Sequence, residues 1–235
     1  MKRTFLLTIL LLSTLCGWAQ LIKPQKATAE DYIPLLKEMG YEVYSFDLSE
    51  LGKDSTTYKI QPVVKHYVNG EEEVCMDLGI SFTNRDGDVV YNKAVVSLSP
   101  CQMSLSPDMV AKQMTFNLDF YQIGYPLLFK KTVSPDGKEN TMCGSRPFKL
   151  NEIRIGEFTP LVLYGSAWYD KESGCFRFCG DKAISPDMHE DIVKYIPEYY
   201  VIGLIIRKLL SFFSGSRSWR LRTTSRSSLC PMAPS

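Results

Sequence analysis

The chain has 235 residues, of which 45% are hydrophobic and 23% charged, and its formal net charge is +1. This composition is typical of a globular protein and excludes a collagenous, low-complexity or generally disordered chain. The charge is unevenly distributed, because residues 20–206 hold 19 of the 27 basic residues and all 26 acidic ones, a net charge of −7. An acidic body argues against nucleic acid as a partner, because phosphate binding needs clustered Lys and Arg side chains.

The first 19 residues have the three parts of a secretory signal peptide. Lys2 and Arg3 form the basic start, an apolar stretch covers residues 5–15, and residues 17–19 read Gly-Trp-Ala, a small-x-small cleavage site. The apolar stretch is too short to cross a hydrocarbon core, which needs about 20 residues. We therefore predict cleavage after Ala19 and export to the periplasm or the cell exterior.

Cys16 offers an alternative, because it closes the apolar stretch and could accept a lipid after signal cleavage. Lipid attachment sites carry a small residue before the cysteine, whereas this chain has the bulky Leu15. The lipoprotein interpretation is therefore the less favoured one.

One helix and two strands are predicted at the start of the mature chain. Apolar residues at helical spacing predict a helix over residues 29–39, capped by Thr28 and ended by Gly40. Its apolar positions are Tyr32, Leu35, Leu36 and Met39. Strands are expected over residues 41–48 and 56–68, and the second of them ends at an Asn69-Gly70 hairpin turn.

The rest of the body consists of short strand-like runs separated by turn residues. The runs cover residues 73–83, 88–98, 115–124, 127–133, 148–155, 159–169, 175–178 and 199–206. Clusters of Ser, Asn, Asp, Pro and Gly between several of them are typical of turns. We predict a mainly β domain over residues 20–206, an antiparallel β-sandwich or related two-layer sheet with one or two short helices outside.

An internal two-fold repeat is also predicted. Ser106-Pro107-Asp108-Met109 recurs as Ser185-Pro186-Asp187-Met188, and flanking matches extend the units to about 88–124 and 168–203. Each unit then contains a strand, a cysteine, a Ser-capped turn with Pro at the first helical position, and a strand ending in Ile-Gly. The alternative is that Ser-Pro-Asp is a good helix start that the chain uses twice.

Three segments resemble small secreted proteins of unknown function from Bacteroidales. They are the export signal ending in Trp-Ala-Gln, residues 40–47 (Gly-Tyr-Glu-Val-Tyr-Ser-Phe-Asp) and the Tyr67-Val68-Asn69-Gly70 hairpin. The resemblance covers residues 1–206. It implies a β-rich exported domain and assigns no catalytic residue.

The tail, residues 207–235, differs from the body because it is basic, rich in Ser and free of acidic residues. In one interpretation, residues 201–213 and the later arginines form a basic amphipathic contact with a membrane surface. The apolar run within them is too short and too interrupted to span a bilayer. The other interpretation is a disordered, non-native sequence, such as the product of a shifted reading frame. We favour the second.

The five cysteines of the body do not determine a disulfide pattern. Export permits disulfides, but an odd number leaves one thiol unpaired. On one strand, Cys175 and Cys179 would lie about 13 Å apart, beyond the roughly 7 Å between Cα atoms that a bridge allows. A single Cys-x-x-x-Cys also lacks the second ligand pair of a zinc site. We expect most of the five to be small buried hydrophobic residues with at most one bridge: Cys75, Cys101, Cys143, Cys175 and Cys179.

Signatures of catalysis are absent from the sequence. The two histidines are His66, expected at a solvated or edge position of a hairpin strand, and His189, expected at the start of a helix after the second Ser-Pro-Asp-Met. No Gly-x-Ser-x-Gly elbow, phosphate loop or dinucleotide fingerprint occurs, and Asp86-Gly87-Asp88 lacks the further ligands of an EF-hand. We predict no catalytic residue, no metal and no cofactor.

Aromatic side chains are the best candidates for ligand contacts, because they offer large rigid surfaces with polar tips. The candidates are Tyr164, Trp168, Tyr169 and Tyr200. On a strand, Trp168 and Tyr169 must face opposite sides. The alternative is that these residues fill the core of the sandwich.

The leading hypothesis is therefore a noncatalytic exported β-sandwich that binds a carbohydrate or a protein, without a transmembrane span. One alternative is a secreted hydrolase that uses a Cys or Asp with His189. Another is a structural subunit of an envelope assembly that pairs through an exposed strand edge. The oligomeric state is left open.

Overall fold

The computed structural model describes residues 26–53, 56–86, 89–101, 106–118, 121–149 and 153–209. The predicted signal peptide (1–19) and residues 210–235 of the predicted tail lie outside the described residues. Among the helices of the described ranges, none has the length and apolar character needed to cross a membrane.

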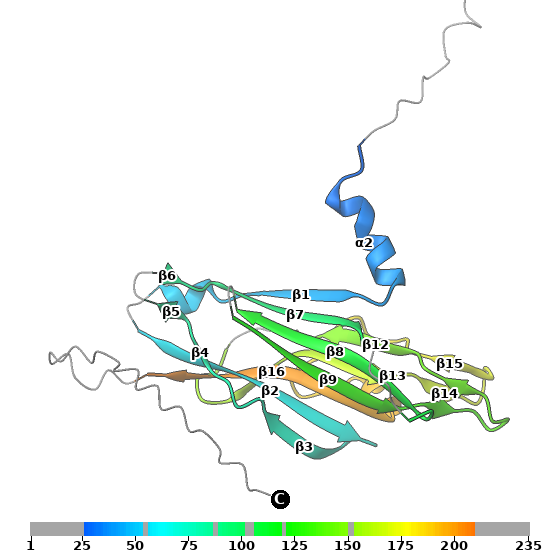
Figure 1. Ribbon diagram of the computed structural model, residues 1–235. Coiled ribbons are helices and arrows are strands. Elements are labelled where there is room, and N and C mark those ends of the chain that lie inside the picture. The colour runs from blue at the N-terminus through cyan, green and yellow to red at the C-terminus, as the bar shows by residue number, and fades with distance from the viewer. Residues whose placement is uncertain are drawn as a thin grey trace, which may run out of the picture.

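Two antiparallel sheets make up the body of the protein (Figure 1). The first has the strand order β1 (Glu42–Asp47), β7 (Lys93–Pro100), β8 (Met109–Leu118), β9 (Tyr121–Lys130). The second has the order β12 (Cys143–Pro147), β13 (Phe158–Ser166), β16 (Glu198–Lys208), β2 (Tyr58–Val68), β3 (Glu71–Asp77), and β4 (Phe82–Thr83) pairs with β2. The predicted mainly β, antiparallel architecture is confirmed.

One hydrophobic core joins the two sheets. Strand residues alternate between the two faces of a sheet, so every second residue of β7, β8 and β16 points inward. The core residues of the first sheet include Val96, Leu98, Met114, Phe116, Leu127 and Phe129, and those of the second include Ile60, Val64, Val162, Tyr164, Tyr200, Ile202, Leu204 and Ile206. This packing of one inner face on the other is that of a sandwich.

A second hydrophobic cluster covers part of the outer face of the second sheet. Ile192 and Val193 of the short helix α3 (Asp191–Tyr195) are buried there, together with Ile184 and Ile196. They pack on outward-facing strand residues, namely Tyr67, Leu163, Tyr199 and Val201. Strands β13 and β16 are therefore buried on both faces, which explains their almost unbroken apolar sequences.

Short ribbons and turns complete the fold. The pairs are β5 (Arg85–Asp86) with β6 (Val89–Val90), β10 (Thr132–Val133) with β11 (Glu139–Asn140), and β14 (Trp168–Asp170) with β15 (Cys175–Arg177), and a 3-10 turn η1 covers Ser49–Gly52. The β2–β3 hairpin turns at Asn69 and Gly70, whose φ angles of 51° and 84° confirm the predicted Asn-Gly turn.

Several predicted strands differ from the observed ones. The runs predicted over 73–83, 88–98 and 159–169 each contain two strands, namely β3 and β4, β6 and β7, and β13 and β14. Residues 115–124 form no single strand, because β8 ends at Leu118 and β9 begins at Tyr121, and these two residues lie opposite each other in an antiparallel hairpin. The strand predicted over 148–155 is also wrong, because β12 ends at Pro147 and Phe148 makes only an isolated bridge with Ile184.

The last strand is longer than predicted. Arg207 and Lys208, which the prediction assigned to the tail, pair with Lys59 and Tyr58 of β2. The change from strand to tail therefore falls two residues later than the composition indicated.

Both Ser-Pro-Asp-Met segments form the same turn. The backbone N–H of Met109 donates to the carbonyl of Ser106 at 3.0 Å, and that of Met188 donates to Ser185 at 2.9 Å. The first turn leads directly into strand β8, whereas the second precedes helix α3. The first unit therefore has the predicted order of turn and strand, the second has a short helix between its turn and β16, and the two-fold repeat stays a prediction.

Helix α2 (Ala29–Glu38) confirms the predicted N-terminal helix. The backbone N–H of Thr28 donates to the Asp31 carboxylate at 2.7 Å as part of a capping box, and Gly40, with a φ of 81°, follows the helix end. None of its residues is buried, and the helix projects away from the sheets (Figure 1).

Candidate functional site

Two of the four aromatic candidates, Tyr164 and Tyr200, lie in the core. They are 2% and 5% exposed, and they sit opposite each other on β13 and β16 with their side chains on the inner face. Both rings contact the edge of Phe129, and the Tyr200 hydroxyl donates to the carbonyl of Leu128 at 2.8 Å. Neither ring offers a face to a ligand, and the burial of both favours the core interpretation for these two residues.

Trp168 and Tyr169 on β14 diverge, as the alternation of strand residues requires. Trp168 lies 5.7 Å from Tyr195, measured between ring centroids, with the planes inclined by 24°. Tyr169 instead packs edge-on against Phe176 at 5.3 Å. Trp168 therefore contacts an aromatic residue of α3, whereas Tyr169 contacts one of the paired strand β15.

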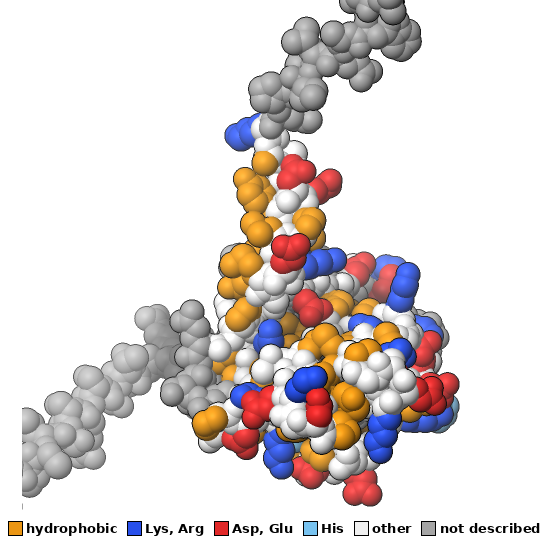
Figure 2. Space-filling view, turned by 90° about the vertical axis from the view of Figure 1, so that its right-hand side faces the viewer, with side chains coloured by type: hydrophobic (Ala, Val, Ile, Leu, Met, Phe, Trp, Pro, Cys, Tyr) orange, Lys and Arg blue, Asp and Glu red, His pale blue; other side chains and the backbone are white. Residues whose placement is uncertain are grey.

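Trp168 and Tyr195 line a groove between the β14–β15 hairpin and α3. The groove has a volume of about 600 Å³, within the range of small-molecule sites. Its lining residues are Trp168, Asp170, Glu172, Arg177, Cys179, Gly180, Asp181, Asp191, Ile192 and Tyr195. Figure 2 views the molecule from the side on which β14 and β15 lie in Figure 1, and the surface there mixes apolar and charged side chains.

Tyr195 is the one strongly exposed aromatic side chain among the described residues of this groove, at 60% exposure. Its position follows from α3, which turns Ile192 and Val193 inward to the outer face of the second sheet and leaves Tyr195 outward. The candidate set taken from the sequence omitted Tyr195. On a helix, Tyr195 lies on the same side as Ile192 three positions earlier, so the sequence pattern carries no signal that its ring is exposed.

Carboxylates dominate the charge of the groove. Asp170, Glu172, Asp181 and Asp191 line it together with one guanidinium, Arg177, whose Nη1 lies 2.9 Å from Asp170. Asp191 is also paired with the Lys194 ammonium at 2.6 Å. A hydrogen bond from the Ser173 hydroxyl at 2.7 Å holds the pKa of Asp170 below its ordinary value. The groove thus presents ionised oxygen acceptors beside an aromatic surface.

A second groove, of about 630 Å³, lies on the outer face of the second sheet and is lined by Lys65, Tyr67 and Phe158, among others. Its aromatic faces are already covered. The Lys65 ammonium lies 5.0 Å above the Phe158 ring, and Tyr67 stacks on Tyr199 at 4.8 Å. This groove therefore lacks an open aromatic surface of the kind that Tyr195 provides.

The five cysteines of the body are all free thiols, and the expectation that most are buried is wrong. Cys75, Cys175 and Cys179 are exposed, and the other two are partly exposed. The Cys175 sulfur lies 3.0 Å from the Ser173 hydroxyl, and this contact and Arg177 lower the pKa of the thiol. Burial instead raises the pKa of Cys143 to about 11.

The two histidines occupy different environments. His66 is largely buried, against expectation, with Nε2 2.9 Å from Glu198 Oε1 and its ring stacked on Tyr200 at 4.3 Å. His189 is exposed, and its Nε2 lies 3.5 Å from the carboxylate of Asp187, which is also exposed. Within the described ranges, no group of three His, Cys, Asp or Glu side chains is arranged to hold a metal ion.

Comparison with known proteins gives one match. A family model described as "Domain of unknown function (DUF5041)" matches residues 16–208, a region that ends at the last residue of β16. No curated protein and no solved structure matches the chain. The match confirms the resemblance to proteins of unknown function, and their assignment to Bacteroidales stays a prediction.

Proposed function

Because the chain belongs to the DUF5041 family, whose function is unknown, we propose a function from its own geometry: an exported, noncatalytic domain that binds carbohydrate. The binding site is the groove between the β14–β15 hairpin and α3. The observation that carries this proposal is the exposed ring of Tyr195, stacked on Trp168 at the edge of an acidic groove.

The groove offers the two kinds of contact that a sugar needs. A sugar ring has an apolar C–H face that packs on an aromatic ring, and hydroxyl groups that donate hydrogen bonds. Tyr195 and Trp168 supply the aromatic surface, and Asp181, Asp191 and Asp170 supply the acceptors. Hydrogen bonds to ionised acceptors are stronger than neutral ones, so the carboxylates fix the orientation of the ligand.

The size of the groove favours a carbohydrate over a protein ligand. A stable protein interface needs about 800 Å² from each partner, usually over a flat surface. A groove of about 600 Å³ between one hairpin and one short helix fits a short oligosaccharide instead. The predicted export supports this choice, because polymeric glycans are found in the envelope and outside the cell.

Glycan-array screening of the purified chain, followed by calorimetric titration with the best ligand, tests the proposal. We expect Tyr195→Ala to weaken binding at least tenfold, whereas Tyr195→Phe, which keeps the ring, retains most of it. Asp191→Asn and Asp181→Asn should also weaken binding. Glu157→Gln is the matched control, because it removes a carboxylate that lies outside this groove.

Two results would overturn the proposal. One is the absence of any glycan ligand, and the other is a ligand whose affinity is the same for the wild-type chain and for Tyr195→Ala. Hydrolysis of the bound glycan would mean that the domain is an enzyme and not a noncatalytic binding module. In that case His189→Ala tests the predicted hydrolase, since an unchanged rate removes His189 from the mechanism.

A further inference from the structure

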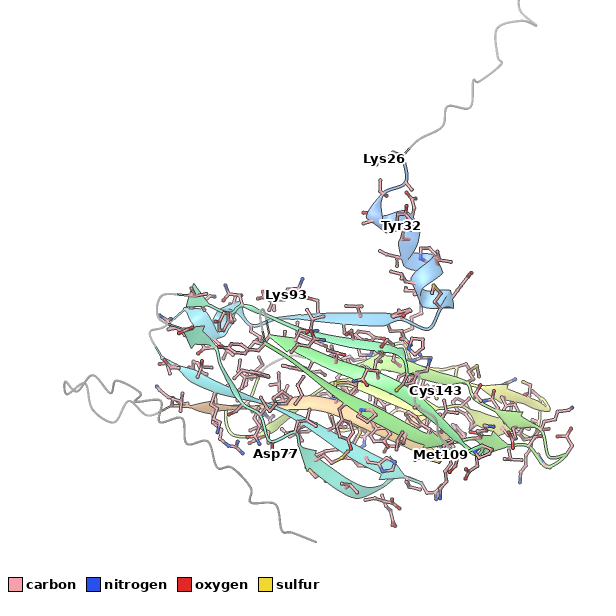
Figure 3. The ribbon with its side chains drawn as sticks, viewed as in Figure 1. Lys26, Tyr32, Asp77, Lys93, Met109 and Cys143 are labelled. Carbon is pink, nitrogen blue, oxygen red and sulfur yellow. The ribbon has the colours of Figure 1, made fainter. Side chains whose placement is uncertain are left out.

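Helix α2 and the start of β1 carry a series of exposed apolar side chains. On α2 the exposed fractions of the large apolar side chains run from 45% to 54%, and the residues are Tyr32, Ile33, Leu35, Leu36 and Met39. Tyr41 and Val43 continue this surface along the chain. Figure 2 shows apolar side chains along one side of the projecting helix, and Tyr32 lies far from the sheets in Figure 3.

Helix α2 needs a partner surface for thermodynamic reasons. Helices shorter than about 12–15 residues are marginal in water, and α2 has 10 residues. Pro34 in its interior removes one backbone donor and costs about 3 kcal/mol relative to a good helix former. The capping box stabilises the helix by only about 1 kcal/mol, which does not offset the cost of the proline. A stable α2 therefore requires burial of its apolar side.

The last strand of the described residues does not cover this surface. Strand β16 ends at Lys208, at the opposite end of the sandwich from α2 (Figure 1). A lipid surface is also a poor fit, because interfacial helices carry Lys and Arg on their polar side. The polar side of α2 instead carries three acidic residues, Glu30, Asp31 and Glu38, and one basic residue, Lys37.

We propose that the α2–β1 surface is a homodimer interface, in which the α2 helices of two copies pack antiparallel across a two-fold axis. Antiparallel packing opposes the helix dipoles and brings Lys37 of one copy toward the acidic first turn, Glu30 and Asp31, of the other. Strand β1 follows the helix in the chain and, among the described residues, pairs with no strand other than β7.

The available area matches that of a dimer. Taken from their exposed fractions, the apolar side chains of this surface amount to roughly 700 Å² in each copy, close to the ~800 Å² per partner of a standard interface. Leu35 and Leu36 lie at the middle of the helical part. Replacing either with a charged residue would bury an unpaired charge in the dimer.

Sedimentation equilibrium of the purified chain over a concentration series tests the proposal. We expect a dimer whose dissociation constant rises at least tenfold in Leu35→Glu and in Leu36→Glu. Val133→Glu is the matched control, because it places the same charge at an exposed apolar residue of β10 and should leave the dimer unchanged. Near-ultraviolet circular dichroism verifies that each variant keeps the sandwich fold.

A charge exchange tests the antiparallel arrangement. Lys37→Glu alone should weaken the homodimer, and mixing it with a Glu30→Lys variant, which keeps the Asp31 capping box, should form a heterodimer tighter than either variant alone. A wild-type chain that is monomeric at all concentrations, or a dimer insensitive to Leu35→Glu, overturns the proposal. So does a monomer that binds phosphatidylglycerol vesicles through α2 in a flotation assay.

Discussion

Tyr44 on β1 and Ser145 on β12 are joined by a 2.5 Å hydrogen bond between their hydroxyl groups, although they lie 101 residues apart in the chain. Ser145 is buried and also donates to the Glu42 carboxylate. The two strands are edge strands of different sheets. This contact therefore links the sheets along one side of the sandwich.

Removing the Tyr44 hydroxyl should destabilise the fold. We expect Tyr44→Phe to lower the free energy of unfolding by about 1 kcal/mol, because Ser145 loses a partner that water cannot fully replace. Urea denaturation measures the change. Tyr121→Phe is the matched control, because the Tyr121 ring packs on Phe82 and Tyr91 in an exposed position, and its loss of a hydroxyl should cost little. Equal stabilities for the two variants would contradict the assigned role of Tyr44.

Glu198 links the two sheets on the other side of the core. One carboxylate oxygen contacts His66 on β2, and the other accepts the backbone N–H of Lys130 on β9 at 2.8 Å. We expect Glu198→Ala to cost about 2 kcal/mol, since both donors are then left without their acceptor. Denaturant unfolding of Glu198→Ala, His66→Ala and the double variant measures the coupling between them. Glu157→Ala is the control, because Glu157 is exposed and its loss should change the free energy of unfolding by less than about 0.5 kcal/mol.

The buried tyrosines predict a loss of stability at alkaline pH. Burial raises the pKa of Tyr200 from 10.0 to about 12, and it raises the pKa values of Tyr164 and Tyr67 as well. A raised folded-state pKa contributes stability that is complete below the unfolded value near 10 and is lost as the pH rises through the folded value. Unfolding monitored by circular dichroism should therefore coincide, above pH 10, with tyrosinate absorbance at 295 nm. Tyrosine ionisation complete by pH 10.5 in a folded chain would contradict this.

Cysteine labelling should distinguish the thiols of the folded protein. Near pH 8, iodoacetamide should modify exposed Cys175 much faster than Cys143, because the Cys175 pKa is lowered by Ser173 and Arg177, whereas burial raises that of Cys143 to about 11. Peptide mass spectrometry of time points measures both rates. Ser173→Ala should slow the reaction of Cys175 and leave Cys143 unchanged, and equal rates for the two thiols would refute the assignment.

Local sequence chemistry predicted most of the strands and turns. The Asn69-Gly70 turn needs positive φ angles, which these residues adopt readily, so the β2–β3 hairpin could be located without a structure. The β8–β9 hairpin could not, because residues 119–120 are Asp-Phe and carry no glycine or proline as a turn signal. The strand predicted over residues 115–124 therefore extended across the point where the chain turns from β8 into β9.

The candidate site was only partly predictable, because burial of an aromatic side chain depends on residues distant in the sequence. Tyr164 and Trp168 lie in the same predicted run, residues 159–169, yet the first is covered by the opposite sheet through Phe129. The second borders a groove because α3 lies next to it. Tyr195 belongs to the groove for the same reason.

By itself, the sequence determined the β class, the antiparallel connections with good turn chemistry and the helix α2, since alternation, turn residues and capping residues act over a few neighbouring positions. Only the tertiary structure decided which face of each strand is covered. The second sheet has a core on its inner face and a second cluster with α3 on its outer face, so alternation alone cannot separate a core tyrosine from a ligand contact.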